Sequence, residues 1–247
     1  MLEPVAGEPA AVARVPEPAL VVADYHAGIE EGLREDGVEL RSHAADRRES
    51  LLRLLVETEA ERVVILGDLG HGIGEPHGVE RGELEELFAT LTERVTVTVT
   101  KGNHDGGIES VAGAFDDVAV ADGPGVRLGD VGFCHGHTWP DPEVLEAPLV
   151  CTAHEHPQVR LEDEVGGTRV ERVWLRGNLD STGFPADVYD RERFGERLVV
   201  TPAFNPLVGG TYVNEADGFL SPFLPDGLAD GEAYLLDGTR LGDYRRV

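Results

Sequence analysis

The chain has 247 residues, of which 41% are hydrophobic, so it can bury a core of its own and is not a peptide ligand or mini-scaffold. With 21 basic against 47 acidic residues, its formal net charge is −26, which argues against a large basic surface for nucleic acid but allows a local one. Lys101 is the only lysine. Because molar salt screens the repulsion within so acidic a surface, this composition favours a halophilic protein over the alternative of an ordinary acidic cytosolic protein.

Residues 1–18 contain Glu3, Glu8 and Glu17 among several Ala and Pro residues, and we expect a flexible leader there. They lack the basic start and apolar stretch of a secretory signal, and no run approaches the roughly 18 apolar residues of a membrane span. The two cysteines, Cys134 and Cys151, are too few for a disulfide framework and fit buried, reduced thiols. Together these features predict a cytoplasmic protein without a membrane partner.

The first half of the chain alternates short apolar runs with helical patterns. Strands are predicted at 19–24, 62–66 and 95–100, and helices at 48–60 and around 84–91. Polar residues stand at the end of each strand: Asp24 after the first, Asp68 after the second, and residues 102–105 after the third. Repeated strand–helix–strand units indicate a largely parallel sheet.

Beyond residue 110 strands prevail. They are predicted at 126–128, 131–134, 149–152, 159–161, 170–175, 198–201 and 233–236. Gly129-Asp130 and Gly166-Gly167 are typical of hairpin turns, so this half should be richer in antiparallel pairs. We therefore expect an α/β fold with two sheets and outer helices, in a single domain over residues 19–247.

Five polar clusters fall at or just after predicted strand ends. They are Asp24-Tyr25-His26, Gly67-Asp68, Gly102-Asn103-His104-Asp105, His135-Gly136-His137 and His154-Glu155-His156. Strand ends of an open α/β sheet face one crevice, so these residues can converge. Imidazole, carboxylate and amide groups suit manganese, iron or zinc. Two such ions about 3.5–4 Å apart can activate a water molecule and clamp a phosphate in an in-line displacement.

Some histidines remain open on the sequence alone. His135 and His137 are two residues apart, so both can lie on one face of a strand, and we favour His135 as the ligand because it directly follows the apolar run. His71 is either an exposed loop residue or faces the substrate. His43 and His77 are expected in solvated loops.

In order and type, these clusters resemble the motifs of the calcineurin-like metallophosphoesterase superfamily, over the stretch from Asp24 to His156. The resemblance implies a four-layer αββα sandwich of two mixed β-sheets flanked by helices. It also implies a metal-dependent phosphoesterase with two divalent ions, most often Mn²⁺, with Zn²⁺ or Fe as alternatives. A hydroxide between the two ions would attack the phosphate ester.

Carried onto this chain, the resemblance implies seven metal ligands: Asp24, His26 and His156 for the first ion, Asn103, His135 and His154 for the second, and Asp68 bridging both. His104 matches the catalytic histidine, which stabilises the transition state or protonates the leaving oxygen. Asp105 would orient the His104 ring.

A finer resemblance joins His154-Glu155-His156-Pro157 with Pro202-Ala203-Phe204-Asn205-Pro206-Leu207. It is to archaeal phosphoesterases related to SbcD-type nucleases, and to the bacterial phosphoesterase found beside a DNA ligase. This implies phosphodiester hydrolysis on DNA or RNA, related to repair. Residues 202–207 would form either a wall of the substrate cleft or a buried turn.

Alternatives to a nuclease stay open. A phosphomonoesterase or cyclic-nucleotide phosphodiesterase would use the same residues on a small substrate, and a catalytically silent scaffold would use the fold for protein contacts. Arg160, Arg172 and Arg176 lie around one predicted hairpin and either meet phosphates or form a solvated face. The sequence gives no indication of an oligomeric state.

Overall fold

The computed structural model of the chain describes residues 1–162, 165–215 and 218–247. Its first sheet consists, in spatial order, of β1 (Leu2–Pro4), β2 (Ala11–Ala13), β3 (Ala19–Val22), β4 (Arg62–Leu66), β5 (Thr96–Thr100) and β6 (Val118–Ala121). Strands β3 to β6 are parallel, and β1 and β2 add an antiparallel edge. The short apolar runs of the first half therefore form one mixed sheet.

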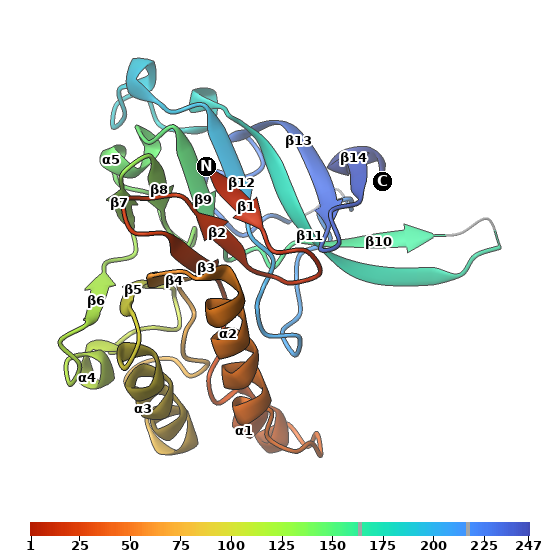
Figure 1. Cartoon of the computed structure of the whole chain (residues 1–247). Helices are drawn as coiled ribbons and strands as arrows, with labels where there is room; N and C mark the ends of the chain where they lie inside the picture. The colour runs from red at the N-terminus through yellow and green to blue at the C-terminus, as the bar shows by residue number, and fades with distance from the viewer. Residues whose placement is uncertain (163–164, 216–217) are drawn as a thin grey trace.

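The second sheet holds the strands of the second half. In spatial order they are β14 (Arg240–Asp243), β13 (Leu228–Leu235), β11 (Thr168–Leu179), β12 (Arg197–Val200), β9 (Leu149–Thr152), β8 (Val131–Phe133) and β7 (Val126–Leu128). Strand β10 (Gln158–Glu162) pairs with β11, and the two extend together as an arm beyond the body (Figure 1). Only β8–β9 and β9–β12 are parallel among these pairs. The predicted excess of antiparallel pairs is confirmed.

Side-chain alternation along the strands separates the molecule into layers. Val21 and Leu66 point into the space between the sheets, where they meet Phe133 and Trp174. The alternate residues of β3 and β4 face the helices of the first sheet. Figure 1 shows α2 (Ala44–Thr58) and α3 (Gly78–Thr92) side by side below that sheet. This arrangement is the predicted sandwich of two mixed sheets.

The remaining helices are short. They are α1 (Ile29–Glu35), α4 (Glu109–Ala112) and α5 (Pro142–Leu145), with 3₁₀ turns at Ser181–Gly183, Arg191–Arg193 and Tyr244–Arg246. The outer face of the second sheet is covered by α5 and by loops that carry Phe184, Tyr189 and Phe223. The layer over the outer face of the second sheet is therefore thinner than the layer that α2 and α3 form over the first sheet.

The expected flexible leader is not found, because residues 2–4 and 11–13 form strands β1 and β2. Leu2, Ala11 and Ala13 are buried in the core between the sheets. Three-residue strands built partly from Ala are too short to produce a hydrophobic period, and the Pro and Glu residues around them indicated a loop. Strands β1 and β2 therefore add apolar contacts to the core that their amino-acid composition did not predict.

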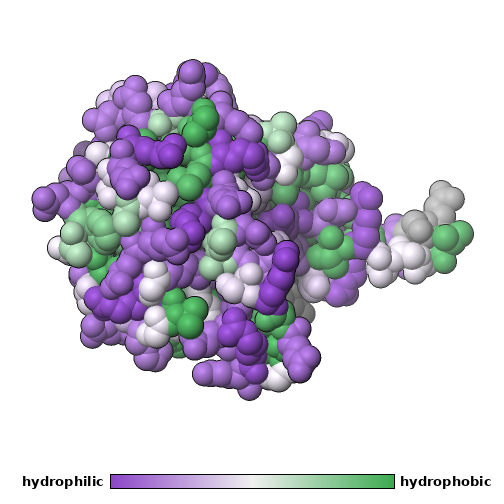
Figure 2. Space-filling view, turned by 60° about the horizontal axis from the view of Figure 1, so that its bottom comes forward, coloured by the Kyte–Doolittle hydropathy of each residue, from purple (hydrophilic) through white to green (hydrophobic). Residues whose placement is uncertain are grey.

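The face of the molecule in Figure 2 is mostly hydrophilic, with small scattered apolar patches. This agrees with the net charge of −26. Within the described ranges, no helix is both long enough and apolar enough to span a bilayer.

Candidate metal centre

The predicted ligands sit where the backbone turns sharply at the ends of strands. Asp24, His26, Asp68, His154 and His156 all have positive φ, at 54°, 49°, 45°, 68° and 43°. Non-glycine residues rarely adopt this left-handed conformation, which costs on the order of 1–3 kcal/mol per residue and gathers at functional sites. The fold therefore holds five candidate ligands in conformations that the surrounding contacts must maintain.

Two of the ligand loops support each other through backbone hydrogen bonds. The N–H of His26 donates to the carbonyl of Asp68 at 2.9 Å, and that of Ala27 to Leu69 at 2.8 Å. These bonds continue the parallel pairing of β3 with β4 past the strand ends. Asp24 and His26 are thereby fixed next to Asp68.

Asp105 was expected to orient the His104 ring, but it instead forms hydrogen bonds to the backbone of the ligand loops. Its buried carboxylate accepts the N–H groups of Leu69, Gly70 and Gly102 at 2.9, 3.1 and 2.8 Å. The ring Nδ1 of His104 instead lies 2.6 Å from the carbonyl oxygen of His71. The Asp105 carboxylate accepts hydrogen bonds from backbone N–H groups and not from the His104 ring. Asp105 is therefore a positioning residue.

The donor atoms of the predicted ligands gather into two groups. Within each group, the ligand atoms all lie within 4.8 Å of one another. The first group is Asp24, His26, Asp68 and His156, and the second is Asp68, His135 and His154. Asp68 belongs to both, which is the position that a bridging carboxylate would need. Six of the seven predicted ligands thus come together.

Backbone carbonyls set which ring nitrogen faces the centre. The Nδ1 of His135 lies 2.7 Å from the carbonyl oxygen of Leu66, and the Nδ1 of His156 lies 2.8 Å from that of Gly209. A carbonyl only accepts, so each Nδ1 carries a proton, and Nε2 is the nitrogen left to bind a metal ion once the ring is neutral. Metal-binding histidines typically have this support on their second nitrogen.

Several buried polar atoms of the first group have no hydrogen-bond partner in the described chain. They are both carboxylate oxygens of Asp24 and the Nε2 atoms of His26 and His156. The Asp24 and His156 side chains approach to 3.2 Å. Leaving buried acceptors unpaired is costly, and a divalent cation would satisfy all of them at once. The donor set therefore fits a metal ion with nitrogen and oxygen ligands.

Each donor group contains one histidine with a lowered pKa and one with a raised pKa. In the first group, burial would lower the pKa of His156, but the carboxylate of Asp24 raises it. Burial lowers the pKa of His26 to about 3 and that of His154 to about 4. Burial would also lower the pKa of His135, but the carboxylates of Asp68 and Asp24 raise it to about 9. Burial would raise the pKa of Asp68, but His135 holds it well below its usual range. His26 and His154 are therefore ready to bind a cation, while His135 must first lose a proton.

Metal affinity is expected to depend on pH for this reason. Below a pKa of about 9, a metal ion must displace the proton of His135. The apparent affinity should therefore rise by up to about tenfold per pH unit as the pH approaches that value, with release of a proton on binding. Calorimetric titration with Mn²⁺ between pH 6.5 and 8.5 measures both. An affinity that stays flat over this range would contradict the assigned protonation state.

His104 lies beside the shared carboxylate but in neither donor group. Its backbone N–H donates to Asp68 Oδ1 at 3.0 Å, and its ring Nε2 is 4.0 Å from Asp68 Oδ2. The side chain is 25% exposed, so a substrate can reach it. Because Nδ1 is bonded to the His71 carbonyl, Nε2 is the atom available for proton transfer.

Two further predicted positions are Asn103 and His137. Asn103 follows Gly102, where a side chain would collide with Asp68. Asn103 itself is exposed. His137 is half-buried, with its ring centroid 5.4 Å from that of His135, and belongs to neither donor group. The preference for His135 over His137 agrees with this geometry.

The sequence left the role of His71 open, and the structure places its ring beside those of His26 and His104. Its Nδ1 is 3.3 Å from Nδ1 of His26, and its ring stacks on that of His104 with centroids 5.8 Å apart. By contrast His77 is exposed. Cys134 and Cys151 are buried and free, as predicted.

Sequence reasoning missed the groups that hold the ligand loops in place. Glu155 is fully buried, and its carboxylate accepts the N–H groups of Leu220 and Ser221. Asn205 donates to the carbonyl of Tyr25 at 2.9 Å, so residues 202–207 do pack against the first ligand loop. A charged residue between two ligand histidines was the available signal for Glu155.

Residues 18–163 match the family model for the calcineurin-like phosphoesterases, which covers more than half of the chain. The chain belongs to the calcineurin-like phosphoesterase family. The predicted family and fold are thereby confirmed. No curated protein sequence matches this phosphoesterase.

One solved structure supports the architecture. The chain matches Pseudomonas putida nuclease MPE with a TM-score of 0.58 at 19% identity, over 98% of this chain and 100% of that chain. It also matches the Escherichia coli phosphoesterase YfcE (TM-score 0.35, 19% identity, 59% and 73% covered) and zinc-bound Vps29 from Entamoeba histolytica (0.31, 16%, 78% and 80%). Of the three, the first is close enough to support the fold.

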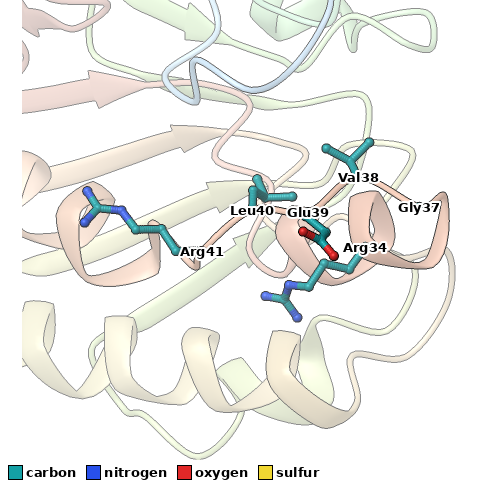
Figure 3. Close-up of a pocket in the computed structure, with 6 residues that line it drawn as sticks. All are labelled: Arg34, Gly37, Val38, Glu39, Leu40 and Arg41. Atoms are coloured by element: carbon teal, nitrogen blue, oxygen red, sulfur yellow. The ribbon is translucent and has the colours of Figure 1, made fainter.

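A cleft of about 480 Å³ opens beside the first donor group. His26, His71 and His156 line it together with residues 207–209 and α1. A second depression, shown in Figure 3, is lined by Arg34 and residues 37–41 of the loop after α1. It contains no predicted ligand, so the cleft beside His26 is the better candidate for substrate.

Proposed function

We propose that this phosphoesterase hydrolyses phosphodiester bonds with two divalent metal ions, and that its substrate is nucleic acid. The observation that carries the two-metal proposal is Asp68, which belongs to both donor groups. His104 stands beside it and outside both groups. The nucleic-acid part is supported by the nuclease that shares the fold along nearly the whole chain, and by the motif resemblance described above.

Asp24, His26 and His156 would hold one ion, His135 and His154 with Asn103 the other, and Asp68 both. When bound, the ions would supply Lewis-acid activation of the phosphate and of a water molecule. Burial of the Asp24 and Asp68 carboxylates excludes bulk water from the donor atoms, which strengthens their attraction for cations. Leu66 and Gly209 keep the imidazole rings in the tautomer that presents Nε2.

His104 would handle the proton. Its Nδ1 proton is committed to the His71 carbonyl, so a second proton can reside only on Nε2. That atom faces Asp68 and is partly exposed to the site. From there it can donate to the leaving oxygen of the ester, or stabilise the charge that develops on the phosphate. The assignment of Mn²⁺ stays a proposal, since the donor set suits Fe and Zn²⁺ too.

Hydrolysis of bis-p-nitrophenyl phosphate beside p-nitrophenyl phosphate tests this function. We expect Mn²⁺-dependent turnover of the diester that exceeds turnover of the monoester and stops on addition of a chelator. Single- and double-stranded DNA and RNA would then be compared. Preference for the monoester would contradict the diesterase proposal, and no turnover with two metals bound would favour a silent scaffold.

We propose further that the protein works in a salt-rich cytoplasm. The support is its net charge of −26 with a single lysine. Because a Debye length of about 3 Å in molar salt screens surface repulsion, the midpoint of thermal unfolding should rise as KCl is raised from about 0.1 M to 2 M. Differential scanning fluorimetry measures this. A midpoint that is unchanged or falls would contradict the proposal.

A further inference from the structure

A third cavity lies behind the loop that carries Asp24 and His26, and no part of the proposed mechanism uses it. It has a volume of about 270 Å³ and is formed by residues 8–9, the first turns of α2, Arg172 at the base of the arm, and residues 204–207. We call it the Arg172 cavity. Phe204 forms part of its wall and stacks on Tyr25, which stands between the ligands Asp24 and His26.

The charges that line this cavity are matched except for one. Glu8 pairs with Arg53 at 2.6 Å, and Asp46 pairs with Arg41 at 3.5 Å. Arg172 is half-buried and donates from Nη1 to the carbonyl of Ala203 at 3.0 Å. Across the ranges that the structure describes, no carboxylate lies within 4.0 Å of its guanidinium. Among the described residues, Arg172 and Arg176 are the half-buried arginines without a carboxylate partner, and only Arg172 lines this cavity.

A second basic side chain in the lining has an unused donor. Arg47 is buried, with 3% of its side chain exposed, and it pairs through its terminal nitrogens with Glu30 and Glu83. Its Nε has no partner among the described residues. A guanidinium has five N–H donors in a planar fork, and both Arg172 and Arg47 therefore retain donors for an acceptor-rich ligand.

The cavity is next to the catalytic cleft. Leu207 lines both, so the segment 204–209 separates them. At one end of this segment Asn205 donates to the Tyr25 carbonyl, and at the other Gly209 accepts from His156 Nδ1. A ligand in the cavity would thus contact the segment that supports ligands of the first donor group.

We propose that the Arg172 cavity is a phosphate-binding subsite, in which the Arg172 guanidinium takes a phosphate group adjacent to the one that reacts. Guanidinium binds phosphate oxygens through paired, charge-assisted hydrogen bonds, which gives both strength and orientation. The proposal rests on the proposed function for the identity of its ligand as a neighbouring phosphate of the substrate strand. A free phosphate compound would use the same chemistry, and the experiment separates the two sources.

Phosphate binding to the metal-loaded protein tests the subsite without any turnover. Equilibrium dialysis with labelled inorganic phosphate, at the lowest KCl concentration that keeps the fold, would compare the natural protein with Arg172→Gln and Arg169→Gln. Arg169 is an exposed arginine on the same strand, so its variant controls for charge. We expect Arg172→Gln to bind one phosphate fewer per chain and Arg169→Gln to match the natural protein. Equal binding by all three would overturn the proposal.

Kinetics then identify the source of the phosphate. For a substrate-strand phosphate, Arg172→Gln should raise KM for a short oligonucleotide about tenfold with kcat kept, and leave KM for bis-p-nitrophenyl phosphate unchanged. An unchanged oligonucleotide KM despite lost phosphate binding would overturn the strand assignment and point to a free phosphate compound. If Arg172→Gln does not fold, Arg172→Lys serves in its place, because it keeps the charge but lacks the planar guanidinium. It should show the same loss of phosphate binding and the same rise in oligonucleotide KM, both smaller. If the natural protein cleaves neither diester, the proposed function fails while the dialysis still decides the subsite.

Discussion

Asp68→Asn is expected to show the largest loss of activity of any single substitution in this chain. Asp68 belongs to both donor groups, and its Oδ1 also accepts the backbone N–H of His104. The amide removes the charge that both cations share. Replacing a residue that merely supports a ligand typically costs about 10–100-fold, so loss of the shared ligand should exceed this, on the order of 10³-fold in kcat/KM.

Metal analysis separates this explanation from misfolding. We expect Asp68→Asn to bind fewer than two Mn²⁺ ions per chain while its circular dichroism stays that of the natural protein. Asp187→Asn is the matched control, because Asp187 is exposed and distant in sequence from every candidate ligand. Two tightly bound ions and unchanged turnover in Asp68→Asn would show that Asp68 does not bridge.

His104→Ala is expected to lose turnover without losing metal. The ring lies in neither donor group, so both ions should stay bound. Its Nε2 is the only ring atom free to move a proton, because Nδ1 is bonded to the His71 carbonyl. Removing a positioned general acid typically lowers the rate by about 10²–10⁴-fold, and we expect kcat to fall within that range.

The leaving group offers a sharper readout. If His104 protonates the leaving oxygen, a diester with a good leaving group such as p-nitrophenolate should suffer less from His104→Ala than a diester with an alcohol leaving group. His77→Ala is the control, since that ring is exposed at the start of α3. Full turnover of both diesters by His104→Ala would refute the catalytic role.

The sequence predicted the strands that carry the site because those strands are short, apolar and buried on both faces. Val63 to Leu66 and Leu149 to Thr152 are continuous apolar or small runs, and both are buried throughout in the structure. Each ends at a polar cluster, and parallel strands bring such ends together. The convergence of the polar clusters therefore follows from local pattern and one topological rule, whereas the family resemblance identified the six residues that gather as candidate ligands.

The parts that were not predicted depend on contacts between distant residues. Strands β1 and β2 are stabilised by burial against the second sheet rather than by their own pattern. Asp105 was expected to orient His104, but the nearest unpaired donors were the backbone N–H groups of residues 69, 70 and 102. Most of these donors lie 30 or more residues away in the sequence, so the sequence did not show which groups Asp105 or Glu155 would bond, although the place of Glu155 between two predicted ligand histidines was a signal.

Buried carboxylates recur as supports of the ligand loops. Asp105 holds the Asp68 loop, Glu80 accepts the N–H groups of His71 and Gly72, and Glu83 accepts that of Gly28. Each satisfies backbone donors that sharp turns leave unpaired. Hydrogen bonds to these carboxylates thus maintain the strained backbone of the ligand loops. The same carboxylates place negative charge around a site that would hold cations.

Electron paramagnetic resonance of the protein titrated with Mn²⁺ tests the central claim most directly. Two ions sharing the Asp68 carboxylate would lie about 3.5–4 Å apart and couple magnetically. We predict that the signal converts to that of a coupled pair at two equivalents, that activity appears with it, and that Asp68→Asn removes the coupling. Saturation at one ion per chain, or two uncoupled ions, would contradict a shared dinuclear centre.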